Sequence, residues 1–262
     1  MQQTPRSSPS HRPDKPLPRS KKVVNIAIAT VVALILVGVS VFAMQQRQVV
    51  AQNTVAAEAY APSFTPVAEE DDRPTALFVG DSYTHGTGVD TKEDRWSSIV
   101  ARKMGWREAN IGQGGTGYAT TSGVQGCGKT FCAAYAETVR AFRTVPADIV
   151  VVAGGQNDFR AYNSDASTVQ KGVSATFAQI ERSFPDAQLV VVGPSTADEI
   201  TDATRGLDRD IQNAARAAGA TYISLLDPEV IEDDMVLEDG GHVGREGHAA
   251  IAERVLSELK ED

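Results

Sequence analysis

Unbroken runs of apolar residues, without the alternation typical of a half-exposed strand, recur through residues 74–262. Clear runs cover 76–79, 148–155 and 188–193, a more mixed run covers 221–226, and a weaker candidate covers 107–112. Strands that are buried on both faces carry such runs of Val, Ile and Leu, because neither face meets water. The pattern therefore predicts a parallel sheet that is covered by helices.

Between these runs the apolar positions follow the helical period, at 91–106, 132–145, 166–184, 202–219 and 245–262. In the fourth stretch one face is formed by Leu207, Ile211, Ala214, Ala215 and Ala218, and in the last by Ile251, Val255, Leu256 and Leu259. Because strand and helix alternate five times, we expect residues 74–262 to form one α/β domain, a three-layer sandwich around a parallel sheet.

A different pattern precedes this domain at residues 23–44. These 22 residues carry no charge, and only Asn25, Thr30 and Ser40 interrupt their apolar character. As a helix they would be about 33 Å long, which matches the apolar core of a bilayer. The alternative is a cleaved signal peptide, in which case the protein is secreted, but the apolar core of such a peptide spans only about 7 to 15 residues. The length favours an uncleaved transmembrane signal anchor.

Charge then orients the predicted anchor. Residues 1–22 hold six Lys and Arg against one Asp and are rich in Pro and Ser, which predicts a disordered tail on the cytoplasmic side. Residues 45–73 are interpreted as a disordered extracytoplasmic linker that ends in a run of acids. The working domain, 74–262, is therefore expected outside the cell membrane.

The net charge of residues 74–262 narrows the range of partners. This part holds 17 Lys and Arg against 28 Asp and Glu, a net charge of −11. Such a surface repels phosphate backbones and anionic lipid headgroups, so nucleic acid is not expected as a partner.

The chain has two cysteines, Cys127 and Cys132, in the stretch "GCGKTFC". Outside the membrane they are expected to close a small loop as a disulfide, with free thiols as the alternative. Two cysteines without a nearby histidine or a second pair cannot complete a zinc shell, so no metal site is expected here.

Residues that can perform chemistry follow the predicted strands. Ser82 follows the first run in "GDSYTHG", "NIGQGGTG" follows 107–112, and Asn157 in "GGQND" follows the run at 148–155. Asp239 and His242 lie in "DGGHVGREGH", before the last predicted helix. The carboxyl ends of strands in an open α/β sheet gather at one edge, where ligands bind. A nucleophile, a base with its orienting acid, and oxyanion donors would meet there.

These four stretches, in this order, resemble those of the SGNH hydrolases, the GDSL-type lipases and esterases, over residues 75–259. The resemblance implies a flavodoxin-like sheet, a serine hydrolase acting on esters, and no metal or organic cofactor. It implies that Ser82 is the nucleophile, His242 the general base and acid, and Asp239 the acid that orients His242. The oxyanion donors would be the backbone N–H groups of Ser82 and Gly115 and the side-chain amide of Asn157.

Each of these residues also has a structural interpretation. Ser82 could be no more than the cap of a helix, and Asn157 could be no more than part of an Asx turn. Among the other histidines, His85 is expected to line the rim, since it follows Ser82 too closely to reach the hydroxyl. His248 is expected to pack or to cap the last helix.

A second motif competes for the same loop. Gly112, Gly114 and Gly117 spell the G-x-G-x-x-G dinucleotide fingerprint, and Glu137 follows 20 residues later. That motif requires a helix to begin at the glycines, whereas residues 116–128 are rich in Gly, Ser and Thr and indicate a loop.

Together these features predict a membrane-anchored extracytoplasmic serine esterase. An O-acetyltransferase or a deacetylase acting on cell-envelope glycans is one alternative, and a non-catalytic binding module is another. No long apolar lid segment is present, which favours a small or exposed ester over a buried triacylglycerol.

Overall fold

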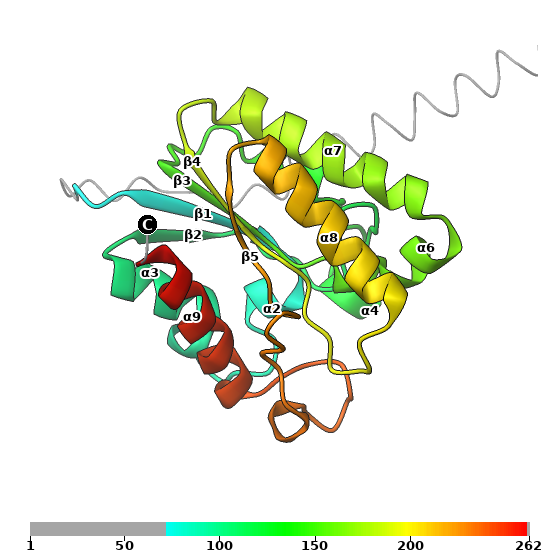
Figure 1. Ribbon diagram of the computed structural model, residues 1–262. Coiled ribbons are helices and arrows are strands. Elements are labelled where there is room, and N and C mark those ends of the chain that lie inside the picture. Colours follow the sequence, from blue (N-terminus) through cyan, green and yellow to red (C-terminus); the bar gives the residue numbers. More distant parts are fainter. Residues whose placement is uncertain (1–71, 261–262) are drawn as a thin grey trace, which may run out of the picture. The chain divides into compact units, whose positions relative to one another are not determined.

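The structure, a computed structural model, describes residues 72–260. In this part of the chain five strands form one parallel sheet in the order β2-β1-β3-β4-β5 (Figure 1). They are β1 (Thr75–Gly80), β2 (Arg107–Asn110), β3 (Ile149–Ala153), β4 (Gln188–Val192) and β5 (Thr221–Ile223). The order is that of flavodoxin-like sheets, in which the crevice beside the first and third strands receives the ligand. The predicted parallel three-layer fold is thus confirmed.

Helices cover both faces of this sheet (Figure 1). One face carries α3 (Trp96–Met104) and α9 (Arg245–Leu259), and the other carries α5 (Tyr135–Ala141), α7 (Ala166–Ser183) and α8 (Asp202–Ala217). Phe78 joins the core under α3, where its ring meets that of Trp96 edge-on at 5.5 Å between centroids, whereas Leu77 joins the core under α7. Because neighbouring strand residues enter different cores, the central strands carry unbroken apolar runs at 76–79, 149–153 and 189–192, whereas the edge strand β2 is largely polar.

Several differences from the predicted elements are short helices, and the strand predicted at 221–226 ends earlier, at Ile223. The predicted helix at 91–106 divides into a 3₁₀ turn, Lys92–Asp94, and α3. No pattern predicts α2 (Ser82–His85), α4 (Val124–Cys127) or α6 (Phe159–Ser164), or the 3₁₀ turns Gln156–Asp158 and Asp233–Met235. One or two turns are too short to display a period.

The predicted cytoplasmic tail, the predicted anchor and almost all of the predicted linker lie outside the described residues. Within 72–260, no helix combines the length and the apolar character that crossing a bilayer requires. The predictions for the first part of the chain therefore rest on its sequence.

Candidate active site

Ser82 lies on a tight turn between β1 and α2. Ser82 is only 8% exposed and is the first residue of α2. The helix is capped by Asp81, whose carboxylate accepts the Tyr83 N–H at 3.0 Å. Ser82 is therefore not the capping residue, and its hydroxyl makes no hydrogen bond within residues 72–260. Gly80 allows this turn, because a Cβ there would lie 2.2 Å from the Thr84 hydroxyl.

Asp81 itself is fully buried under the turn. The Tyr135 hydroxyl donates to its second carboxylate oxygen at 3.1 Å and also lies 3.2 Å from the Ala153 carbonyl. Burial raises the pKa of Asp81 to about 7, although the hydrogen bonds from Tyr83 and Tyr135 act in the opposite direction. Asp81 thus supports the Ser82 turn through these hydrogen bonds, and its pKa lies near neutral pH.

The glycine-rich loop after β2 runs alongside the end of β1. The Ile111 N–H donates to the Phe78 carbonyl, and the Gln113 N–H donates to the Gly80 carbonyl, each at 2.9 Å. A turn follows in which Gly115 adopts φ 73°, a left-handed conformation that glycine reaches without strain. The Gly115 N–H donates to no other group in the described part of the chain.

The Asn110 side chain ties the same loop to the Ser82 turn. Its amide donates to the Thr84 carbonyl at 2.6 Å and to the Ser97 hydroxyl at 2.9 Å, while its oxygen accepts the Gly112 N–H at 3.0 Å. The loop is therefore fixed against α2 by hydrogen bonds as well as by the sheet.

Asn157 and Asp158 follow β3 and reach the same loop. The Asn157 amide donates to the Thr116 carbonyl at 2.9 Å, and because an amide nitrogen has two hydrogens, one remains for a ligand. The buried Asp158 carboxylate accepts the N–H groups of Tyr118, Ala119 and Thr120 at 2.6, 3.1 and 2.9 Å. The sequence offered no signal for this role of Asp158 beyond its place beside Asn157.

Asp239 and His242 form a close pair. Nδ1 of His242 lies 2.7 Å from the carboxylate of Asp239, whose other oxygen accepts the N–H groups of Gly241 and His242, both at 3.0 Å. Hydrogen bonds from Gly241 and His242 lower the pKa of Asp239 to about 2. The ionised carboxylate favours the proton on Nδ1, which leaves Nε2 able to accept one.

Tyr83 connects this pair to the Ser82 turn. Its hydroxyl donates to the Gly241 carbonyl at 3.2 Å, and its ring centroid lies 6.2 Å from that of His242. No hydrogen bond joins the Ser82 hydroxyl to His242 within the described residues. His242 thus lies beside Tyr83, the residue next to Ser82 in the chain. A direct contact between such residues is often missing in substrate-free sites.

The remaining described histidines have other environments. His248 is fully buried, accepts the Trp96 N–H at Nδ1 and contacts the Thr87 carbonyl through Nε2 at 3.1 Å. Burial lowers its pKa, which keeps the ring neutral. His85 is exposed, and partial burial with nearby Arg95 lowers its pKa. The prediction that His248 packs inside the fold is confirmed.

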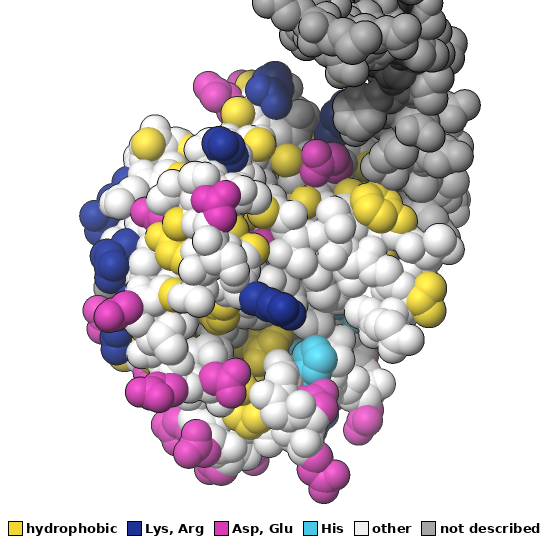
Figure 2. Space-filling view, turned by 90° about the vertical axis from the view of Figure 1, so that its right-hand side faces the viewer, with side chains coloured by type: hydrophobic (Ala, Val, Ile, Leu, Met, Phe, Trp, Pro, Cys, Tyr) yellow, Lys and Arg dark blue, Asp and Glu magenta, His cyan; other side chains and the backbone are white. Residues whose placement is uncertain are grey.

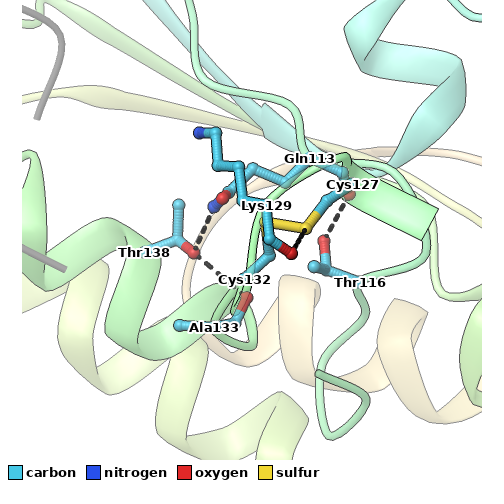
Figure 3. The surroundings of a disulfide bond; sticks show 7 residues. All are labelled: Gln113, Thr116, Cys127, Lys129, Cys132, Ala133 and Thr138. Atoms are coloured by element: carbon cyan, nitrogen blue, oxygen red, sulfur yellow. Dashed lines mark hydrogen bonds between the residues drawn. A yellow bond between two sulfur atoms is a disulfide. The ribbon is translucent and has the colours of Figure 1, made fainter. Parts of the chain in front are cut away.

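The predicted disulfide between Cys127 and Cys132 is present in the structure (Figure 3). Among residues 72–260 no group of three or more His, Cys, Asp or Glu side chains is arranged to hold a metal ion. The next helix after Gly112, Gly114 and Gly117 is α4, which begins only at Val124. The context that a dinucleotide fingerprint requires is therefore not found at these glycines.

Comparison with known proteins identifies the family. A model of the GDSL-like lipase/acylhydrolase family matches residues 78–250. The chain belongs to this family. As a GDSL-like protein it is a serine hydrolase that acts on ester bonds, and no curated protein matches it.

Several solved structures share its fold at low sequence identity. TesA is 18% identical with a TM-score of 0.57, over 71% of this chain and 98% of TesA. Est24, a carbohydrate acetylesterase from Sinorhizobium meliloti, is 15% identical with a TM-score of 0.54, over 72% of this chain and 99% of Est24. The two-domain esterase CEX, active on acetylated mannans, is 18% identical with a TM-score of 0.55, over 72% of this chain and 49% of CEX.

Proposed function

We propose that this protein is a membrane-anchored, extracytoplasmic esterase that works through an acyl-enzyme on Ser82. The observation that carries the proposal is the pairing of Asp239 with His242 at 2.7 Å, on a turn that Tyr83 links to Ser82. A histidine held by a carboxylate through Nδ1 presents Nε2 as a base, which is what a serine hydroxyl needs.

In the proposed reaction the Ser82 hydroxyl attacks the ester carbonyl carbon, and its proton passes to Nε2 of His242. The resulting tetrahedral oxyanion collapses, the bond to the alcohol breaks, and the leaving alcohol takes the proton from His242. Water then attacks the acyl-enzyme, with His242 again accepting a proton, and the acid leaves as Ser82 is restored. Asp239 stabilises the imidazolium form and keeps its charge throughout.

Three donors would stabilise the oxyanion in this scheme. They are the N–H groups of Ser82 and Gly115 and the second amide hydrogen of Asn157. Two features support the assignment: the Gly115 N–H has no partner in the described chain, and the Asn157 amide is fixed to the Thr116 carbonyl. Donors that are already in place cost no reorganisation during the reaction, which is why such sites accelerate acyl transfer.

Small, uncharged esters are the proposed substrates. Residues 74–262 carry a net charge of −11, and Figure 2 shows acidic side chains gathered along the lower edge of one face. Such a field disfavours anionic substrates. Likeness to Est24 and CEX supports acetylated carbohydrates as one group of these esters. A deacetylase or an O-acetyltransferase of cell-envelope glycans is therefore the second candidate function.

Hydrolysis of p-nitrophenyl acetate, butyrate and octanoate by the purified full-length chain tests the proposal, with Ser82→Ala as the inactive reference. We expect activity that disappears in this variant and that is greatest for acetate. Equal rates for the wild type and Ser82→Ala would contradict the proposal. Adding an acetylated glycan and a glycan acceptor separates the candidates, because a hydrolase releases acetate and a transferase acetylates the acceptor.

The location outside the membrane is proposed from residues 1–44 alone. The full-length chain should sediment with membranes, resist alkaline carbonate extraction, and expose residues 74–262 to protease added outside the cell. Release of a shortened chain that begins near Met44 would instead indicate a cleaved signal peptide and a secreted enzyme.

A further inference from the structure

The backbone of Gly114 and Gly115 lies directly against a second loop, residues 122–132, which we call the disulfide loop. A Cβ on Gly114 would lie 2.3 Å from the Gly126 carbonyl oxygen. One on Gly115 would lie 2.6 Å from the Ser122 hydroxyl and 3.4 Å from the Cα of Gly126. The two loops therefore touch backbone to backbone, at the residue proposed to donate to the oxyanion.

The backbone hydrogen bonds of the outer half of this loop stay within the loop, because the N–H groups of residues 126–128 donate to the carbonyls of residues 123 and 124. Residues 124–126 are exposed, and Val124 leaves 65% of its surface to solvent, so α4 buries almost no apolar side chain. One turn of helix without a buried face is unstable by itself. The bond from Cys127 joins this turn to Cys132, which is buried.

Backbone hydrogen bonds hold Cys132 in place. It exchanges two backbone hydrogen bonds with Ser122, each at 2.9 Å. Beyond it, the Thr138 hydroxyl donates to the Ala133 carbonyl at 3.3 Å and accepts the Gln113 amide at 3.1 Å (Figure 3). The base of the disulfide loop is thus tied to the first residue of the turn that contains Gly115.

The opposite side of that turn is also fixed. The Thr116 hydroxyl donates to the Gln113 carbonyl at 2.7 Å (Figure 3). The Thr116 carbonyl accepts the Asn157 amide at 2.9 Å. Gly115 lies between these two anchored residues, and the atoms nearest to a Cβ placed on it belong to Ser122 and Gly126. The disulfide loop therefore limits movement of the Gly115 peptide on this side.

We propose that the Cys127–Cys132 disulfide is a positioning element of the oxyanion site, which holds Gly126 against Gly115 and so fixes the direction of the Gly115 N–H. This inference rests on the proposed function of Gly115. A displaced donor binds the ester nearly as well but stabilises the transition state less, so its loss lowers kcat rather than raising KM. The oxidised loop is then required for full activity.

The first test compares the full-length wild type with a Cys127→Ala, Cys132→Ala double variant on p-nitrophenyl acetate. We expect kcat to fall by about 10-fold to 100-fold while KM changes less than about two-fold, since a misplacement of about 1 Å can cost 10²-fold. Thermal unfolding of both proteins gives the folded fraction at the assay temperature. A kcat within two-fold of the wild type, or a loss equal to the unfolded fraction, would overturn the proposal.

A dithiol reductant provides an independent measurement. It breaks the disulfide to two thiols while closing its own disulfide, so it should reduce the wild-type kcat to that of the double variant. It should leave the double variant unchanged. Equal sensitivity of the two proteins to the reductant would contradict a role for this disulfide.

Two glycines of the disulfide loop supply a matched pair. A Cβ on Gly126 would lie 2.3 Å from the Ser122 hydroxyl and reach the Gly115 Cα, whereas one on Gly123 meets only the Thr130 carbonyl at 3.5 Å. Gly126→Ala should lower kcat at least 10-fold, and Gly123→Ala less than two-fold. Equal effects would oppose the proposal. A wild type without Ser82-dependent hydrolysis would overturn the proposed function, and this inference with it.

Discussion

Two aspartates adjoin the candidate active site, and they differ in burial and in pKa. Asp81, under the Ser82 turn, is fully buried, and burial raises its pKa to about 7. Asp239, beside His242, leaves 53% of its side chain exposed, and hydrogen bonds from Gly241 and His242 lower its pKa to about 2. One carboxyl group gains a proton near neutral pH, and the other keeps its charge.

The difference shows which carboxylate can assist proton transfer. Asp81 is nearest to Ser82 in the sequence, but it contacts the Tyr83 N–H and the Tyr135 hydroxyl rather than a histidine. Asp239 is distant in the sequence yet contacts His242, and its charge can stabilise an imidazolium. The surroundings of the two carboxylates therefore distinguish Asp81, which supports the Ser82 turn, from Asp239 in the proposed catalytic pair.

The largest expected effect comes from removing the base of that pair. His242→Gln should lower kcat/KM for p-nitrophenyl acetate by about 10⁴-fold or more, because Ser82 then has no proton acceptor. The exposed His85 supplies the matched control, and His85→Gln should change activity by less than about three-fold. Loss of activity in His85→Gln, with activity retained in His242→Gln, would show that His85 and not His242 is the base.

A smaller loss is expected from the exposed carboxylate. Asp239→Asn should lower kcat by about 10² to 10³-fold, less than for a buried triad aspartate, because water can partly solvate the imidazolium at this exposed position. Asp233, exposed in the same acidic stretch, provides the control. Equal kinetics for Asp239→Asn and Asp233→Asn would mean that the carboxylate does not assist His242.

The buried carboxylate should act on stability more than on rate. The folded pKa of Asp81 is raised above its unfolded value, so the folded protein binds the proton more tightly. This contribution is complete below about pH 4 and is lost as pH rises through about 7, amounting to about 4 kcal/mol at most. Asp81→Asn should remove that part of the pH dependence of the unfolding free energy.

Chemical denaturation of Asp81→Asn and the wild type at several pH values between 4 and 8 measures this contribution. The variant should gain relative to the wild type as pH rises, and the exposed Asp186→Asn should not. Asparagine suits the site because the Tyr135 hydroxyl can donate to the Ala153 carbonyl instead. A constant difference across this range would show that Asp81 does not exchange its proton there.

The long elements were predictable from the sequence for a simple physical reason. β3 and residues 190–192 of β4 are buried on both faces, so their apolar runs are continuous, and α8 has a full apolar face. The one-turn helix α4 was not predictable, because it is too short to show a period and none of its residues is buried.

The candidate site divides in the same way. The site residues were predicted from their order along the chain and from the resemblance of their motifs to those of the GDSL-type enzymes. They are Ser82, Gly115, Asn157, Asp239 and His242. The supporting contacts could not be predicted. Asp158 binds backbone groups almost forty residues away, and Tyr135 meets Asp81 across 54 residues, so both contacts exist only once the sheet has formed.

The central claim, an acyl-enzyme on Ser82, is tested most directly by covalent labelling. The purified full-length chain is treated with a fluorophosphonate, and the adduct is located by intact mass and by peptide mapping. The account predicts one adduct for each chain, on Ser82, which is lost in Ser82→Ala and slowed in His242→Gln. An adduct on another residue, or esterase activity that persists without any adduct on Ser82, would contradict it.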